Sequence, residues 1–290
     1  MINRNFIIPF FVSLIGFVLL VSMDAVIKLL GDRYSILQLL FLNSLFSLIP
    51  LFYFICKKHS FKFYKNQNYY FQIVRGVIHT IGFLCVLKGV ILLPLSIVYP
   101  VLFTSPLMLL VMSHFFLSDN INIIRVLAIL MGFFGVLISA EPFGSSNVSI
   151  QGVLFIFFGA FCIAITHLIT RKYNYLTSSY SAAFFSMAVS AIIFFFTTRF
   201  SFEVMTVNDL SLSFLGGVFA GLGVSAVIYG SKTLPSSVFG LTSYFQIIYG
   251  VFLGWIIFNQ LPSIYNYFGI LIVILAGLLL FYFDKSENES

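Results

Sequence analysis

Charge is what this sequence has least of. Lys, Arg, Asp and Glu make up 8% of its 290 residues, whereas hydrophobic residues make up 60% and the mean hydropathy is +1.08. A water-soluble chain of this length could not cover so much apolar surface. Apolar runs of roughly 18–25 residues, each long enough to cross a bilayer as a helix, recur along the whole chain. The composition therefore excludes a soluble globular protein and predicts an all-α polytopic membrane protein.

Cysteine and histidine are also scarce. The three cysteines, Cys56, Cys85 and Cys162, are widely spaced, so the sequence predicts neither a disulfide framework nor a metal site. The four histidines lie on separate segments without the H-E-x-x-H spacing of a zinc hydrolase. A Gly-rich phosphate loop and room for a nucleotide-binding domain are missing, which argues against an ATP-driven pump. We expect no cofactor and no nucleic-acid partner.

Acidic side chains inside apolar runs are rarer still. Asp24, near the end of the run Phe6–Leu30, is the one carboxylate well inside such a run. A lone ionised group at bilayer depth costs roughly 2.5–3.5 kcal/mol, so it usually faces a cavity or a partner. Lys28 lies one helical turn away on the same face, and the alternative is a self-neutralising pair from which Lys28 reaches the interface. A membrane-embedded hydrolase would need further catalytic groups at this depth, so the sequence argues against an enzyme.

Ten apolar runs are expected to span the membrane, and the first lacks a small-residue cleavage site and is therefore expected to be retained. Their connections are short, which predicts antiparallel neighbours. We expect a first repeat at 1–140, a linker at 141–149, a second repeat at 150–283 and a disordered polar tail at 284–290. The spans are predicted at approximately 6–30, 35–55, 71–92, 95–117, 122–140, 150–170, 178–198, 210–231, 235–258 and 263–283.

The basic residues predict the orientation of these spans. With the N-terminus inside, ten Lys and Arg residues lie in inner connections and ends, and two, Arg33 and Arg199, lie outside. An excess of Lys and Arg marks the cytoplasmic side. The sequence therefore predicts that both termini are cytoplasmic, and the loop lysines account for the net charge of +6.

An internal repeat relates the two halves. A shift of 141 residues gives eight identities in the 21 positions from Gly76 to Ser96, including Gly82 on Gly223 and Pro94 on Pro235. A shift of 143 residues places Gly16 on Gly159, Asp24 on His167 and Lys28 on Arg171. Because each half has five spans, the two halves must insert in opposite orientations. Inverted repeats are typical of secondary transporters, which open a midplane site alternately to either side.

The order of these motifs resembles the drug/metabolite transporter superfamily, in its ten-helix EamA-type branch. The similar segments are Ser22-Met23-Asp24-Ala25-Val26-Ile27-Lys28, Arg75-Gly76, Leu93-Pro94, Ser105-Pro106, Gly132 with Gly135, and the stretch from Gly254-Trp255 to Pro262. The resemblance covers essentially the full chain. It implies a permease, and the first and third spans look most like permeases for S-adenosylmethionine, followed by those for riboflavin.

Candidate site residues follow from the polar positions inside the spans. Arg75 and Arg171 have interfacial anchoring as an alternative role, and His79 has a hydrogen-bonded structural role as its alternative. Pro100 and Pro106 are expected to bend the fourth span, either to line a pore or to improve packing. The candidates for substrate binding or gating are Asp24, Lys28, Arg75, His79, Tyr99, His167, Arg171, Tyr244 and Gln246.

The sequence thus predicts a secondary transporter of a small polar metabolite in the cytoplasmic membrane. The metabolite expected from the resemblance is S-adenosylmethionine or a related amino-acid or vitamin-like solute, with a riboflavin, amino-acid or drug exporter as the alternative. An intramembrane enzyme and a non-transporting receptor are the rival classes. The expected partners are the small-molecule substrate and the lipid bilayer, and the expected state is a monomer or homodimer.

Overall fold

The computed structural model describes residues 4–59, 69–117, 123–139, 149–173, 178–198, 202–234 and 236–289, and within these ranges it contains α-helices and no strands. This confirms the predicted all-α class. Seven segments are long and apolar enough to cross a membrane, and three shorter apolar segments lie at 126–135, 245–258 and 264–279. The helices are α1 (Arg4–Leu30), α2 (Ile36–His59), α3 (Tyr69–Leu92), α4 (Leu95–Leu102), α5 (Thr104–Leu117), α6 (Ile123–Ser139), α7 (Ile150–Lys172), α8 (Ser179–Thr197), α9 (Val207–Thr233), α10 (Ser236–Phe258) and α11 (Ile264–Glu289).

Each expected span corresponds to one helix except the fourth. There α4 ends at Leu102 and α5 begins at Thr104, with Phe103 between them. Pro100 lies inside α4 and Pro106 inside α5, and a proline cannot supply the backbone hydrogen bond of its position. The Thr104 hydroxyl donates to the Val101 carbonyl over 2.7 Å across the interruption. At the other end of the chain, α11 continues to Glu289, through residues expected to form a polar tail.

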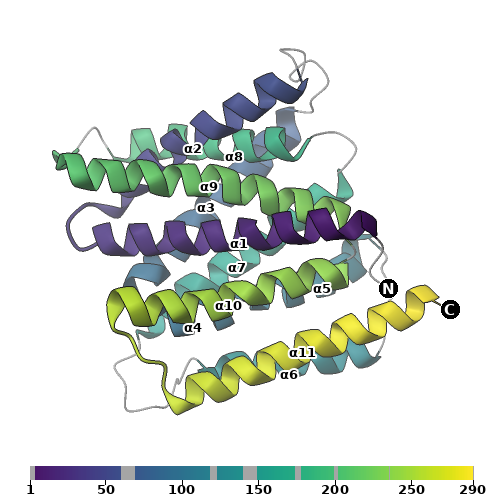
Figure 1. Cartoon of the computed structure of the whole chain (residues 1–290). Coiled ribbons are helices and arrows are strands. Elements are labelled where there is room, and N and C mark those ends of the chain that lie inside the picture. Colours follow the sequence, from purple (N-terminus) through teal and green to yellow (C-terminus); the bar gives the residue numbers. More distant parts are fainter. Residues whose placement is uncertain are drawn as a thin grey trace.

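The helices pack in pairs, and each pair takes one helix from each half of the chain. The α1 helix lies along α9, and its counterpart α7 lies along α3. The α2 helix packs on α8, α4 on α10, and α6 on α11, so each of these pairs joins equivalent spans of the two halves. Figure 1 shows α6 and α11 along one side of the bundle and α2 and α8 along the other, with α1 and α9 between them; α1 begins and α11 ends at the same end of the bundle. This is the arrangement of two inverted five-span repeats.

Two glycine contacts at helix crossings carry this symmetry. A Cβ added to Gly16 of α1 would lie 3.1 Å from the Gly223 carbonyl oxygen of α9, and one added to Gly159 of α7 would lie 3.2 Å from the Gly82 oxygen of α3. The sequence shifts that pair Gly16 with Gly159 and Gly82 with Gly223 therefore relate two equivalent crossings. Glycine at both positions lets the backbones approach closely, which drives helix association in lipid.

Gly221→Ala is expected to destabilise the bundle by about 1–3 kcal/mol, the usual cost of overpacking. A Cβ at this α9 position would lie 2.5 Å from the Ser47 carbonyl oxygen of α2, a backbone atom that cannot turn away. Gly254→Ala is the matched control, since its nearest neighbour would be the Leu95 Cβ at 3.5 Å. Thermal unfolding in detergent would measure both variants. Equal midpoints for the two would contradict the close α2–α9 contact.

Candidate functional site

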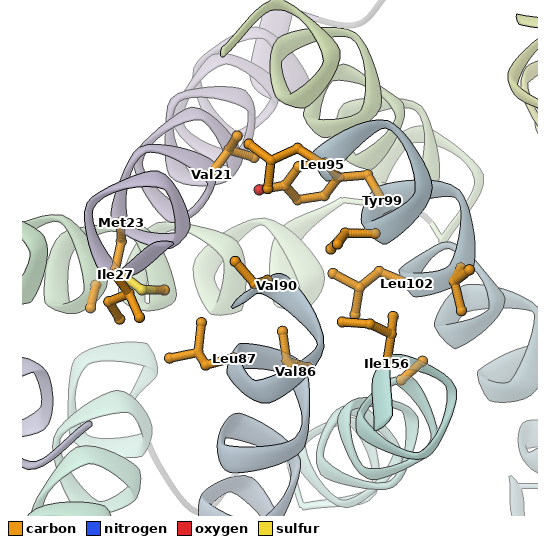
Figure 2. Close-up of a cluster of buried hydrophobic side chains, with 14 of the residues drawn as sticks. Val21, Met23, Ile27, Val86, Leu87, Val90, Leu95, Tyr99, Leu102 and Ile156 are labelled. Carbon is orange, nitrogen blue, oxygen red and sulfur yellow. The ribbon is translucent and has the colours of Figure 1, made fainter. Parts of the chain in front are cut away.

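Asp24 lies where α1 meets α4. Its side chain is 6% exposed, and the Tyr99 hydroxyl of α4 donates a hydrogen bond to its Oδ2 over 3.0 Å. Tyr99 is itself buried, and Figure 2 shows its ring reaching from α4 towards α1 beside Val21. The other edge of the ring lies against Gly250 of α10, where a Cβ would collide with the ring carbons. Gly250 therefore gives Tyr99 the space to reach Asp24.

A second hydrogen bond joins α1 to α10 close to Asp24. The hydroxyls of Ser22 and Tyr249 lie 3.2 Å apart, and Tyr249 is within electrostatic range of Tyr99. Ser22, Asp24, Tyr99 and Tyr249 form the Asp24 cluster. Its two hydrogen bonds join α1 to α4 of the same repeat and to α10 of the other repeat. The partner of Asp24 is a neutral hydroxyl, and among the described residues no basic side chain forms an ion pair with this carboxyl group.

Lys28 does not serve as the partner of Asp24. Its Nζ donates to the Val90 carbonyl over 2.5 Å and to the Leu93 carbonyl, both where α3 ends. The ammonium also lies 5.6 Å from the centroid of the Phe258 ring. The last carbonyls of a helix have no partner within it, and they attract a cation. The interpretation of Asp24 and Lys28 as a self-neutralising pair is thus replaced by two separate interactions.

A cluster of basic side chains lies near the start of α3, away from Asp24 along the bundle. Arg75 is 5% exposed and donates to the Thr170 hydroxyl of α7 over 3.4 Å and to the Ala182 carbonyl of α8. It is therefore a buried residue that joins three helices, not an interfacial anchor. His79 lies one turn further, with its Nδ1 at 3.4 Å from the Ser190 hydroxyl of α8. The groups within electrostatic range of the Arg75 charge are His79, His167 of α7 and Lys232 of α9, and Arg171 is in range of His167. Arg75, His79, His167, Arg171 and Lys232 form the Arg75 cluster.

The remaining candidates are placed less fully. His167 is partly buried, with its ring centroid 6.1 Å from that of Phe239 on α10. Gln246 is half-buried on α10. The side chains of Tyr244 and Pro106 lie outside the described residues. Among the side chains that the structure describes, His, Cys, Asp and Glu nowhere gather in groups of three that could hold a metal ion.

Hydrogen bonds also tie the two repeats together at the end of the bundle where α1 and α3 end and α9 begins, called the Arg33 end. The Arg33 guanidinium pairs with the Asp209 carboxylate over 3.2 Å, and the Tyr34 hydroxyl donates to the same carboxylate over 2.8 Å. The bond to Asp209 raises the pKa of the Tyr34 hydroxyl, which therefore stays protonated and donates. Gln38 exchanges two bonds with the Glu203 backbone, of 2.8 and 2.9 Å. These residues form the Arg33 latch.

Sequence reasoning missed the latch and the Ser22–Tyr249 bond. Their members are ordinary polar residues separated by 165 to 227 positions, and no spacing rule relates them. Gly250 could have been found only by knowing which ring packs against it.

The end of the bundle opposite the Arg33 end, where α2 ends and α3 begins, is called the Lys57 end.

Comparison with known proteins gives concordant results. The model of the EamA-like transporter family matches residues 7–140 and 150–282. An S-adenosylmethionine uptake transporter of Rickettsia bellii is 24% identical over 262 residues, which cover 90% of this chain and 89% of that protein. One from Rickettsia conorii is 25% identical over 268 residues, covering 90% and 88%. A protein solved by crystallography has a TM-score of 0.71 at 15% identity, covering 95% of this chain and 98% of its own, and so shares the fold.

Proposed function

Because the chain belongs to the EamA-like transporter family, we propose that it is a secondary permease of the cytoplasmic membrane that moves S-adenosylmethionine or a closely related metabolite by alternating access. Membership of the family, together with the apolar helices, makes the chain a multi-pass membrane transporter rather than an enzyme. The inverted repeats support alternating access, because each half can adopt the conformation of the other. The names of the Rickettsia relatives support the substrate.

The observation that carries this proposal is the buried carboxylate of Asp24 with a neutral partner. Intramembrane charges are costly and mark substrate paths. S-adenosylmethionine carries two positive groups, a sulfonium and an ammonium, either of which would compensate this carboxylate. Tyr99 bonds to this carboxyl group and Tyr249 bonds to Ser22 two residues earlier on α1. Aromatic faces attract such cations by about 2 kcal/mol when water is excluded. Riboflavin lacks a positive group, so this site favours S-adenosylmethionine over it.

Ligand-dependent thermal stability tests the substrate. A ligand that binds the folded state raises the unfolding midpoint by mass action. S-adenosylmethionine is expected to stabilise the purified protein, whereas S-adenosylhomocysteine, which lacks the sulfonium charge, should do so much less. In Asp24→Asn the two ligands should raise the unfolding midpoint by similar amounts. Stabilisation by riboflavin and by neither adenosyl compound would overturn the substrate assignment.

The orientation of the bundle can be checked with single cysteines. We expect the Lys57 end to face the cytoplasm because the Lys and Arg excess lies there. Cys56 is exposed at this end, and Val204, 97% exposed, lies at the Arg33 end. In intact cells, a membrane-impermeant maleimide should label Val204→Cys in a Cys-free background. It should label native Cys56, kept as the single cysteine, only after permeabilisation. The reverse pattern would invert the topology.

A further inference from the structure

The Arg75 guanidinium is incompletely satisfied in a buried position. Two of its nitrogens donate to Thr170 and Ala182, but its Nε has no hydrogen-bond partner. Arginine normally presents its donors as a planar fork to a carboxylate or phosphate. A buried donor left without an acceptor is costly, so an unpartnered one inside a bundle needs an explanation.

A second orphaned donor lies on α8 next to the residues that Arg75 and His79 contact. The Ser186 hydroxyl is 1% exposed and has no partner. It stands one helical turn from Ala182, which accepts from Arg75, and one turn from Ser190, which lies against His79. These three positions share one face of α8, so Ser186 lies between the contact points of the arginine and the histidine.

The titratable groups that the structure describes around this face are all bases rather than acids. Arg75 is within electrostatic range of His79, His167 and Lys232, and His167 is within range of Arg171. In the described part of the chain, no carboxylate bonds to Arg75 or to either histidine. The Asp24 cluster shows the opposite situation, a carboxylate with a neutral partner. The described part of the bundle thus holds a buried carboxyl group whose bonding partner is not a base and a buried guanidinium whose bonding partners are not acids.

The two sites are separate levels of the bundle. The contact between Lys28 and the Val90 carbonyl places these two residues at one level of the roughly parallel helices α1 and α3. Asp24 lies four residues before Lys28 on α1. Arg75 lies fifteen residues before Val90 on α3. At 1.5 Å per residue the levels are about 16 Å apart along the bundle. A substrate group held at Arg75 is therefore not in contact with Asp24.

We propose that Arg75 and Ser186, with His79 and His167 beside them, form an anion site that receives the carboxylate of the transported molecule in the cytoplasmic half of the bundle. The proposal rests on the proposed function and deepens it: the substrate class is a zwitterionic or cationic amino-acid derivative whose carboxylate this site binds. The guanidinium Nε and the Ser186 hydroxyl supply the donors, and the charge of the guanidinium attracts the anion. Asp24 selects the positive group and Arg75 the negative one.

Anion-dependent stability tests the site without assuming a substrate. The full chain in phosphatidylcholine nanodiscs would be unfolded thermally in acetate, phosphate or chloride at constant ionic strength. Acetate is expected to raise the midpoint over chloride in wild type and in Lys88→Gln, and to have no such effect in Arg75→Gln. Lys88 is a matched control because it lies on the same helix but over the Phe155 ring, 5.4 Å from its centroid. An equal acetate effect in Arg75→Gln, or none in wild type, would overturn the site.

A second variant and a second lipid composition complete this test. If Arg75→Gln does not fold, Ser186→Ala removes one donor without altering charge and should weaken the acetate effect several-fold; an unchanged effect would overturn the proposal. Discs containing phosphatidylglycerol examine a lipid source of the anion. Stabilisation by that lipid but not by acetate, lost in the variant, would assign the site to a headgroup and overturn a substrate role.

Transport of a matched pair separates this proposal from the proposed function. Wild type should favour S-adenosylmethionine over its decarboxylated analogue by about tenfold or more, and Arg75→Gln should remove that preference. If neither compound is transported while acetate still stabilises through Arg75, the substrate assignment fails and the anion site stands. If both are transported equally by wild type, the carboxylate site fails and the permease stands.

Discussion

Asp24→Asn is expected to abolish or strongly reduce transport while leaving membrane levels near normal. The substitution keeps the shape of the side chain and its hydrogen bond with Tyr99, 3.0 Å in the wild type, but removes the charge that we propose compensates the substrate. A hydrogen bond to a charged group contributes about 1.5–3 kcal/mol, so the loss should be at least about tenfold in apparent affinity. Uptake of labelled S-adenosylmethionine by cells with matched expression would measure it.

Tyr99→Phe is the control for this result. It removes the neutral partner of Asp24 and leaves the charge, so it should impair transport less than Asp24→Asn. Because Lys28 bonds to the carbonyls that end α3, its substitution should neither mimic nor rescue the Asp24 variant. Wild-type uptake by Asp24→Asn at equal expression would remove Asp24 from the substrate path.

Cross-linking the Arg33 latch is expected to stop transport completely and reversibly. Arg33 belongs to the first repeat and Asp209 to the second, and their side chains meet at 3.2 Å. Alternating access requires the repeats to separate at one end while they close at the other. A short bifunctional thiosulfonate joining Arg33→Cys to Asp209→Cys in a Cys-free background would hold the Arg33 end closed.

The single-cysteine variants control for modification without cross-linking. Each should retain partial transport after treatment, because the latch also includes the two bonds between Gln38 and the Glu203 backbone. Addition of a reductant should restore transport by the double variant. Undiminished uptake by protein shown to be fully cross-linked would mean that the Arg33 end does not open during the cycle.

The sequence predicted the spans and the repeat because both depend on local or small-residue signals. Apolar length identifies a membrane helix without knowledge of its neighbours. The glycines Gly16, Gly82, Gly159 and Gly223 recur because two symmetric crossings need close backbone approach, so a sequence shift could detect them. Asp24 stood out for a similar reason, since a single carboxylate inside an apolar run is visible without any structure.

The partners of the polar residues could not be predicted in the same way. Helical periodicity places Lys28 on the same face of the helix as Asp24. The partner of each side chain comes from a neighbouring helix, however, and the sequence alone does not give the position of that helix. Lys28 bonds to the carbonyls at the end of α3, and Asp24 accepts from the hydroxyl of Tyr99, 75 residues away. Arg75 was expected to have an anchoring alternative because it lies near a helix start, yet the packing of α7 and α8 buries it.

Counterflow in liposomes tests the central claim most directly. Purified protein would be reconstituted into vesicles loaded with unlabelled S-adenosylmethionine and diluted into a trace of the labelled compound. A permease that alternates access exchanges the two, so label should accumulate transiently inside wild-type vesicles and not inside Asp24→Asn vesicles. Label that never exceeds the level in protein-free vesicles, for S-adenosylmethionine and for related zwitterionic metabolites alike, would contradict the account.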